Sequence, residues 1–170
     1  DKLSPEEMMS YLELIHSSGK EASGLLENLL NWSRLKVGTF NANFYYLNSR
    51  ELIDRVLRFL DPMAKRKNIS LSASENPTVE VYADENMLET VLRNLGTNAI
   101  KYTNEGGKVV FKAGLMNNNK TFFVEVEDNG TGMIDEVKDN LFRIDVKNSL
   151  RGTNDEVGSG LGLVLRSEFM

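Results

Sequence analysis

Three short stretches of the sequence carry residue types suited to binding a phosphate compound and a metal ion. In the first, a predicted helix places Asn94, Asn98 and Lys101 on one narrow strip, because side chains three and four residues apart share a helix face. An amide oxygen is a neutral ligand suited to Mg²⁺, and a lysine ammonium can meet a phosphate. The alternative is a polar helix edge with solvated amides. The core face of this helix is expected at Leu88, Val91, Leu92, Leu95, Ala99 and Tyr102.

The second stretch, residues 128–133 (DNGTGM), directly follows a predicted strand. The carboxylate of Asp128 could accept a hydrogen bond from an amine such as that of adenine. Gly130 and Gly132 would let the backbone approach a planar ring. The alternative is an ordinary Asp-Asn-Gly turn, which is common in proteins.

The third stretch, residues 158–163 (GSGLGL), opens a predicted helix. A glycine-rich turn at a helix N-terminus presents several N–H groups and the positive end of the helix dipole, and so favours a phosphate. The dinucleotide-binding fingerprint is excluded because no βαβ context surrounds the stretch, and a P-loop is excluded because no Gly-Lys-Ser/Thr follows. The alternative is a flexible linker into a helix.

The elements that must position these stretches begin with one long helix. Ser4, Pro5 and Glu7 form a typical helix start with a capping box, and Gly38 suits the end. Between them an apolar heptad stripe predicts packing against a partner helix, as in a bundle. The alternative is a core helix of a single compact domain. The stripe comprises Met8, Tyr11, Leu12, Ile15, Ala22, Leu25, Leu26, Leu29 and Trp32.

The remainder of the chain is predicted to alternate helices with strands in a mainly antiparallel sheet, an α+β architecture. A helix capped by Ser49 is expected to be kinked, or to lose its regular hydrogen bonding, at Pro62. Its apolar positions are Leu52, Val56, Phe59, Leu60, Met63 and Ala64. The other predicted elements are extended segments at 40–47, 69–73 and 79–82, a helix at 84–102, a hairpin of 108–116 with 121–127, a loop at 128–160 with at most a short helix, and a last helix from Gly160.

Composition bounds the class of protein. The chain has 170 residues, suited to one domain or one domain with an appendage, and 41% of them are hydrophobic. A net charge of −5 argues against a general nucleic-acid surface. The absence of cysteine excludes thiol chemistry, and a single histidine, His16, excludes a multi-histidine metal site. No apolar run is long enough to span a membrane. Because the chain starts at Asp1, we expect a piece of a longer protein.

Taken together and in this order, the three stretches resemble the N, G1 and G2 boxes of the sensor histidine kinases. The matching segments are 93–103 (RNLGTNAIKYT), 126–133 (VEDNGTGM) and 158–163 (GSGLGL), and Leu141-Phe142 looks like the F box. Residues 25–40 (LLENLLNWSRLKVGTF) look like the second helix of the dimerisation and phosphotransfer bundle of these kinases.

The resemblance implies a two-layer α/β sandwich of the histidine kinase and gyrase type, preceded by one long bundle helix. Residues 1–38 would be part of that bundle, and residues 39–170 a catalytic ATP-binding domain truncated at its C-terminus. The cofactors would be ATP and Mg²⁺. Asn98 would be a catalytic residue that holds Mg²⁺ through ATP, and Asn94 would lie nearby on the same helix face. Lys101, the second catalytic residue, would lie with Tyr102 by the phosphates or the ribose.

The same resemblance implies that Asp128 binds the amine of adenine and that Gly130 and Gly132 shape the pocket around the ring. It places Phe142 in a lid, expected over 134–157 and displaced without nucleotide. The residues that flank the phosphates would be Gly158, Gly160, Leu161 and Gly162.

The resemblance implies that the chain would be part of a bacterial-type kinase. Such a kinase passes the ATP γ-phosphate to a histidine and then to an aspartate of a response-regulator receiver domain. The complete protein would be a homodimer through its bundle, and this portion would lie in the cytoplasm. Any attachment to a membrane would be made by other segments, and no nucleic-acid partner is expected. His16 lacks the Glu-Leu-Arg sequence that follows the phosphoacceptor histidine, so the chain alone is not expected to phosphorylate itself. The alternatives are a non-catalytic scaffold and a gyrase-type ATPase, in which a glutamate replaces Asn94.

Overall fold

The computed structural model describes residues 42–74, 78–117, 121–139 and 152–153, together with part of the first 26 residues. The chain divides into two compact units, Asp1–Asn41 and Ala42–Met170. Within the described residues, every helix falls short of the length and apolar character that crossing a membrane requires. The described residues of the first unit are 4, 5, 7–9, 11, 12, 14, 15, 18, 19, 22, 23 and 26.

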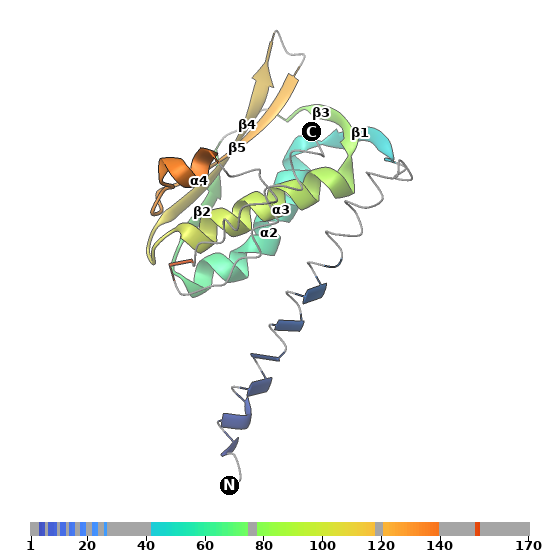
Figure 1. Ribbon diagram of the computed structural model, residues 1–170. Coiled ribbons are helices and arrows are strands. Elements are labelled where there is room, and N and C mark those ends of the chain that lie inside the picture. The colour runs from blue at the N-terminus through green and yellow to red at the C-terminus, as the bar shows by residue number, and fades with distance from the viewer. Residues whose placement is uncertain are drawn as a thin grey trace. The chain divides into compact units, whose positions relative to one another are not determined.

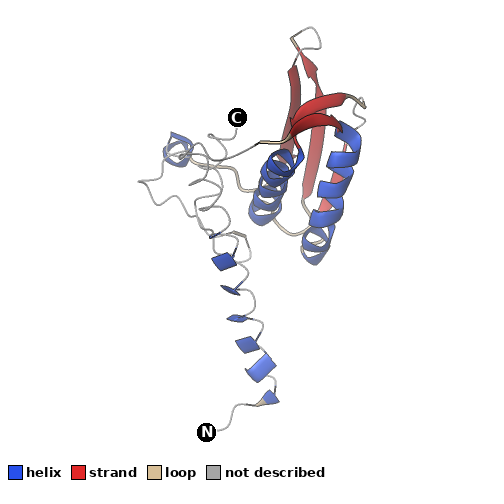
Figure 2. Cartoon of the chain, turned by 90° about the vertical axis from the view of Figure 1, so that its right-hand side faces the viewer, coloured by secondary structure: helices blue, strands red, loops and turns tan. Residues whose placement is uncertain are grey.

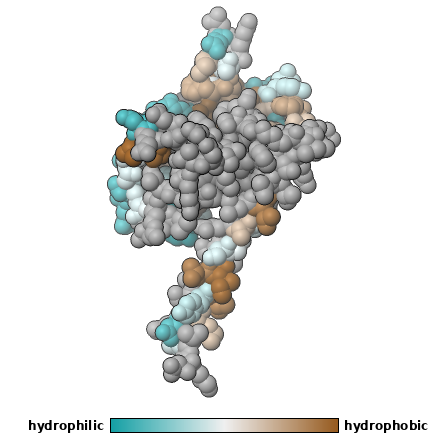
Figure 3. All heavy atoms as spheres, viewed as in Figure 1, coloured by the Kyte–Doolittle hydropathy of each residue, from teal (hydrophilic) through white to brown (hydrophobic). Residues whose placement is uncertain are grey.

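The first unit begins with the predicted capping box. The Glu7 N–H donates to Ser4 Oγ at 3.1 Å, and the Ser4 N–H donates to Glu7 Oε2 at 2.8 Å. The hydrogen bond from the Ser4 backbone N–H, and then one from the Ser4 side chain, lower the pKa of the Glu7 carboxyl. The described residues from Pro5 to Leu26 are helical, and their apolar side chains are exposed, as the brown atoms of Figure 3 show. His16 and the predicted end at Gly38 lie outside the described residues.

The second unit contains the predicted mixture of helices and strands (Figure 1). Strand β4 lies between β2, which runs parallel to it, and β5, which runs antiparallel, while β1 and β3 form a separate antiparallel pair. The described sheet pairings are therefore mainly antiparallel, as predicted. The elements are β1 (Phe44–Asn48), α2 (Ser49–Arg66), β2 (Ser70–Ala73), β3 (Glu80–Asp84), α3 (Glu85–Tyr102), β4 (Lys108–Met116), β5 (Thr121–Asp128) and α4 (Asp135–Asp139).

Helices α2 and α3 form one layer against the three-stranded sheet (Figure 2), which confirms the two-layer α/β sandwich. Alternation along β4 turns Val109, Phe111 and Ala113 inward, because successive side chains of a strand point to opposite faces. Phe111 is the largest of the fully buried side chains among the described residues. The helices contribute Leu52, Ile53, Val56, Leu60, Ala64, Leu92, Ala99 and Ile100 to the same core.

Helix α2 differs from expectation at its N-cap and at Phe59. Its N-cap is Asn48, whose Oδ1 accepts from the N–H groups of Arg50 and Glu51, and Ser49 is instead buried with its Oγ accepting from the Val79 N–H at 3.1 Å. The helix passes through Pro62 and continues to Arg66. Proline has no N–H to donate, so one regular hydrogen bond is lost at this position while the flanking turns continue. Phe59 is 48% exposed rather than part of the core.

Helix α3 is held to β4 and α2 at Gly96. A Cβ at this position would lie 2.2 Å from Leu60 Cδ1 and 2.8 Å from Phe111 Cζ, so the glycine permits a close approach. The predicted core face is confirmed at Val91, Leu92 and Ala99, which are buried, and Leu88 packs against the core. Gly96 and Ile100 also face the core, because the glycine lets the helix approach Leu60 and Phe111 closely. Leu95 and Tyr102, which were expected on this face, are only half-buried.

We predict that Gly96→Val destabilises the second unit by about 1–3 kcal/mol, the usual cost of overpacking a core. Urea unfolding followed by circular dichroism measures the change. Asn86→Val places the same side chain at an exposed position of α3 and should change the free energy of unfolding by less than about 0.5 kcal/mol. Equal stability of the Gly96→Val variant and the wild type would contradict the close packing described above.

Candidate functional site

The polar strip predicted on α3 is present at the border of the core. Asn94 and Asn98 are half-buried, and Lys101 is only 9% exposed. The Lys101 ammonium nitrogen lies 5.1 Å from the centre of the Tyr102 ring, a distance at which a cation is attracted to an aromatic face. The last turns of α3 therefore combine two amides, one cation and one aromatic ring.

The turn after β5 is fixed by hydrogen bonds to its own side chains and to β4. Asp128 Oδ1 accepts from the Gly130 N–H at 2.9 Å. Asn129 Oδ1 accepts from the Lys108 N–H at 2.7 Å, and the Asn129 N–H returns a bond to the Lys108 carbonyl at 3.3 Å. Gly132 has a φ of +67°, a left-handed conformation that favours glycine. The carboxylate of Asp128 is thus exposed at a defined position at the end of the strand.

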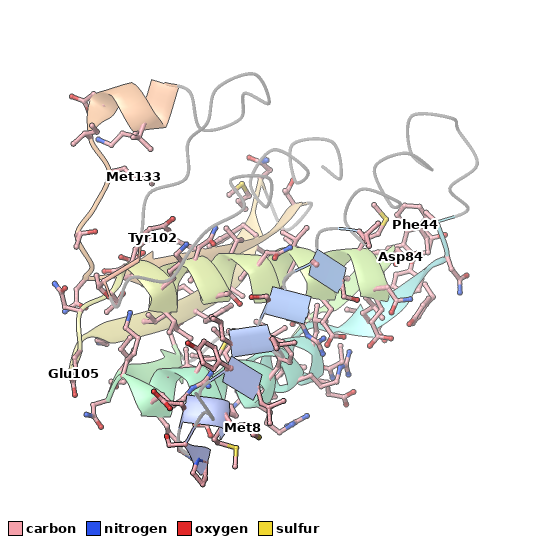
Figure 4. All side chains as sticks on the ribbon, turned by 60° about the horizontal axis from the view of Figure 1, so that its bottom comes forward. Met8, Phe44, Asp84, Tyr102, Glu105 and Met133 are labelled. Carbon is pink, nitrogen blue, oxygen red and sulfur yellow. The ribbon has the colours of Figure 1, made fainter. Side chains whose placement is uncertain are left out.

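This turn is docked on the C-terminal end of α3. The Thr131 N–H donates to the Tyr102 carbonyl at 3.0 Å, and a Cβ at Gly130 would lie 2.3 Å from the same carbonyl oxygen. Figure 4 shows Tyr102 at this end of the helix and Met133 on the segment that leads away toward α4. Two of the stretches singled out in the sequence are therefore in direct contact.

Glu127 precedes Asp128 and has a different electrostatic environment. A hydrogen bond from the Lys112 ammonium, and then the attraction of its charge, lower the pKa of the Glu127 carboxyl. Glu127 is therefore ionised and paired with Lys112 across the hairpin, and this pairing accounts for its lowered pKa without any contact to α3. Asp128, which directs its carboxylate into the turn, is the acid suited to a ligand.

Sequence reasoning missed Lys67 and Thr153, which meet at the same end of α3. The Lys67 ammonium donates to the carbonyls of Ile100 and Lys101, each at 3.0 Å, and to Thr153 Oγ1 at 2.6 Å. The Thr153 N–H donates to the Lys101 carbonyl at 3.1 Å. No local pattern distinguishes either residue, since each bond joins positions far apart in the sequence.

The remaining predicted site residues lie outside the described residues. They are Phe142, Gly158, Gly160, Leu161 and Gly162, together with most of the predicted lid and the last helix.

A family model described as histidine kinase-, DNA gyrase B-, and HSP90-like ATPase matches residues 83–170. The chain belongs to this ATPase family. The match begins beside the start of α3 and includes the docked turn, so it covers both described parts of the site.

Similar proteins narrow the type of ATPase to the histidine kinases. The autoinducer 2 sensor kinase/phosphatase LuxQ of Vibrio parahaemolyticus is 27% identical over 97% of this chain, which spans 20% of its length. Full-length ShkA in complex with AMPPNP is 26% identical with a TM-score of 0.75, over 99% of this chain and 34% of that one. Histidine kinase ThkA in complex with response regulator protein TrrA is 25% identical with a TM-score of 0.65, over 83% of this chain and 41% of that one. The predicted ATP-binding catalytic domain of a sensor histidine kinase is confirmed.

We predict that Gly130→Ala releases the turn from α3, because the added Cβ collides with a backbone carbonyl that cannot rotate away. The Thr131 amide should then exchange its hydrogen about fivefold faster or more, as expected for the loss of one hydrogen bond. Nuclear magnetic resonance measures this rate for the single amide. Thr131→Ala, which retains the N–H and changes only an exposed side chain, should leave the rate unchanged; unchanged exchange in Gly130→Ala would mean that the turn is not docked.

Proposed function

We propose that the second unit binds Mg-ATP between the last turns of α3 and the turn after β5, and presents the γ-phosphate for transfer to a histidine. The observation that carries this proposal is the hydrogen bond from Thr131 to the Tyr102 carbonyl, with the close approach of Gly130. Together they bring a strand-end carboxylate beside a helix that carries two amides and a lysine.

Each described residue has a role that its chemistry supports. Asp128 accepts a hydrogen bond from the adenine amine, and the open space around the Cα of Gly132 leaves room for the ring. Lys101 and Tyr102 lie at the ribose and phosphates, where a cation offsets their negative charge. Phosphoryl transfer needs positioning and neutralisation more than covalent help from the protein, and this set of residues supplies both.

The donor set suits Mg²⁺ held mainly by the nucleotide. Within the described residues, no group of three or more His, Cys, Asp or Glu side chains is arranged to hold a metal ion by itself. Mg²⁺ keeps several waters and bridges phosphates, so a few protein oxygens are sufficient. Asn98, half-buried on α3, would hold the ion through its amide oxygen. When bound, Mg²⁺ neutralises charge on the phosphate oxygens.

Transfer to a histidine is favoured over hydrolysis by Asn94. An amide cannot remove a proton from water as a carboxylate does, so the site lacks a general base at this position. The acceptor would be a histidine other than His16, and the next acceptor an aspartate of a response-regulator receiver domain, in keeping with the ThkA complex with TrrA. We propose that the complete protein is a homodimer and that this portion works in the cytoplasm, where ATP is available.

Two other functions remain as outcomes of the same experiments. A scaffold with a degenerate site would bind no Mg-ATP, which calorimetric titration detects. A gyrase-type ATPase would release inorganic phosphate steadily without a phosphohistidine, which a coupled phosphate assay detects.

We predict that Asp128→Ala weakens Mg-ATP binding by at least about tenfold, because a charge-assisted hydrogen bond to the adenine is lost. Isothermal titration calorimetry gives the dissociation constant, and GTP, which lacks the 6-amine, should bind the wild type weakly. Asp135→Ala removes a carboxylate that is also exposed and pairs with Lys138, and should leave binding unchanged. Wild-type affinity in Asp128→Ala would reject the adenine assignment.

We predict that Asn98→Ala removes most of the dependence of ATP binding on Mg²⁺ while affinity without the metal changes little. The comparison is the ratio of dissociation constants with Mg²⁺ and with a chelator. Asn86→Ala, an exposed asparagine on the first turn of α3, is the matched control and should retain the wild-type ratio. An unchanged ratio in Asn98→Ala would place the metal elsewhere.

A further inference from the structure

Asn129 is the residue at which the pairing of β5 with β4 ends, and its side chain takes part in that pairing. The last residues that the two strands pair are Val109 and Asp128. Beyond them the Asn129 N–H donates to the Lys108 carbonyl at 3.3 Å. In a regular antiparallel ladder the Lys108 N–H would return a bond to the backbone carbonyl of Asn129. It donates instead to Asn129 Oδ1 at 2.7 Å, so the side-chain amide replaces the main chain in this pair.

The start of β4 is a well-fixed anchor for this side chain, because Gly107 is itself hydrogen-bonded on two sides. Its carbonyl accepts from the Ser70 N–H at 2.9 Å, and its N–H donates to the Asn104 carbonyl at 3.0 Å. A Cβ at Gly107 would lie 2.8 Å from Asn129 Oδ1, so the glycine leaves the room that the amide occupies. The position of the Asn129 side chain is therefore set by the start of β2 and by the turn after α3 together.

Asn129 also lies between the two residues whose hydrogen bond orients the proposed adenine contact. Asp128 Oδ1 accepts from the Gly130 N–H at 2.9 Å, so the direction of this carboxylate depends on the backbone on both sides of Asn129. A hydrogen bond weakens steeply as its angle departs from linear, and a small rotation of the carboxylate would therefore weaken its bond to an amine. The amides and the lysine of α3 do not depend on that rotation.

We propose that Asn129 is a positioning residue for adenine selectivity: by holding the end of β5 on the start of β4, it fixes the direction of the Asp128 carboxylate. This inference rests on the proposed function. Asn129 needs no contact with the ligand for this role. Loss of its anchor reduces recognition of the 6-amine of adenine, whereas binding of the rest of the nucleotide is retained.

The test is a calorimetric titration of the whole chain with Mg-ATP and with the magnesium complex of purine riboside triphosphate, which lacks only the 6-amine. The wild type should bind ATP about tenfold more tightly than the analogue, as expected for one charge-assisted hydrogen bond. Asn129→Leu keeps the size of the side chain but removes the accepting oxygen. It should lower this ratio to about twofold, with the affinity for the analogue unchanged. Asn129→Asp keeps the oxygen and should retain the wild-type ratio.

Asn86→Leu is the matched control, because it makes the same substitution at an exposed position on the first turn of α3. It should keep the wild-type ratio. If Asn129→Leu keeps the full ratio, or weakens the binding of both nucleotides equally, the inference is wrong while the proposed function stands. Loss of the ratio in Asn129→Asp would also overturn the inference, since the accepting oxygen is then not what matters.

The wild type separates this inference from the proposed function. Equal binding of ATP and the analogue by the wild type would overturn the inference and the adenine role of Asp128, but not the binding of Mg-ATP. If the wild type binds neither nucleotide, the proposed function and this inference both fail. Should Asn129→Leu not fold, Asn129→Ala also removes the accepting oxygen and decides the question in its place.

Discussion

The carbonyl groups at the C-terminal end of α3 are the constraint on which the site depends. The last four carbonyls of any helix have no partner within the helix, and the negative end of the helix dipole lies there as well. In this protein the Thr103 N–H makes the last regular bond of the helix, to Ala99, and each of the four carbonyls that follow accepts from a distant segment. The donors are Lys67 to Ile100 and Lys101, Thr153 to Lys101 and Thr103, and Thr131 to Tyr102.

Satisfying these carbonyls also assembles the site. The turn that holds Asp128 approaches α3 because Thr131 donates to its last residue, and glycine at position 130 allows the approach. At the other side of the helix, Gly96 brings α3 close to Leu60 and Phe111 and so sets its rotation about its own axis. That rotation leaves Asn94 and Asn98 at the border of the core, where they are half-buried and still available to a ligand.

The sequence predicted the elements well where the signal is local. The capping box of Ser4 and Glu7, the alternation of β4 and the position of α3 depend on neighbouring residues, and the structure confirms all three. The choice of Ser49 over Asn48 as a cap failed because both residue types cap well, and the pairing of Ser49 with Val79 is not visible in the sequence. Apolar patterning could not reveal Gly96, since a glycine carries no apolar signal.

The contacts that complete the site depend on the tertiary fold, and the sequence gives no indication of them. Lys67 and Thr153 are polar residues in unremarkable surroundings, and their importance comes from the carbonyls they meet. The motif resemblance predicted Asp128 and α3 as parts of one site, and the structure brings their segments into contact through Thr131. The roles of Phe142 and of the glycines from 158 to 162 stay predictions.

The parallel pairing of β2 with β4 has a consequence for how the protein folds. Ser70 pairs with Lys108, and α3 with β3 lies between them in the sequence, so the sheet closes only after that whole crossover has been made. Contacts between such distant positions carry a loop-closure cost that slows folding. During synthesis β2 leaves the ribosome without its neighbour, whereas β4 and β5 can pair as a local hairpin at once. We therefore expect the hairpin of β4 and β5 to form first. Strand β2 would pair with β4 late, after α3 has packed against the hairpin.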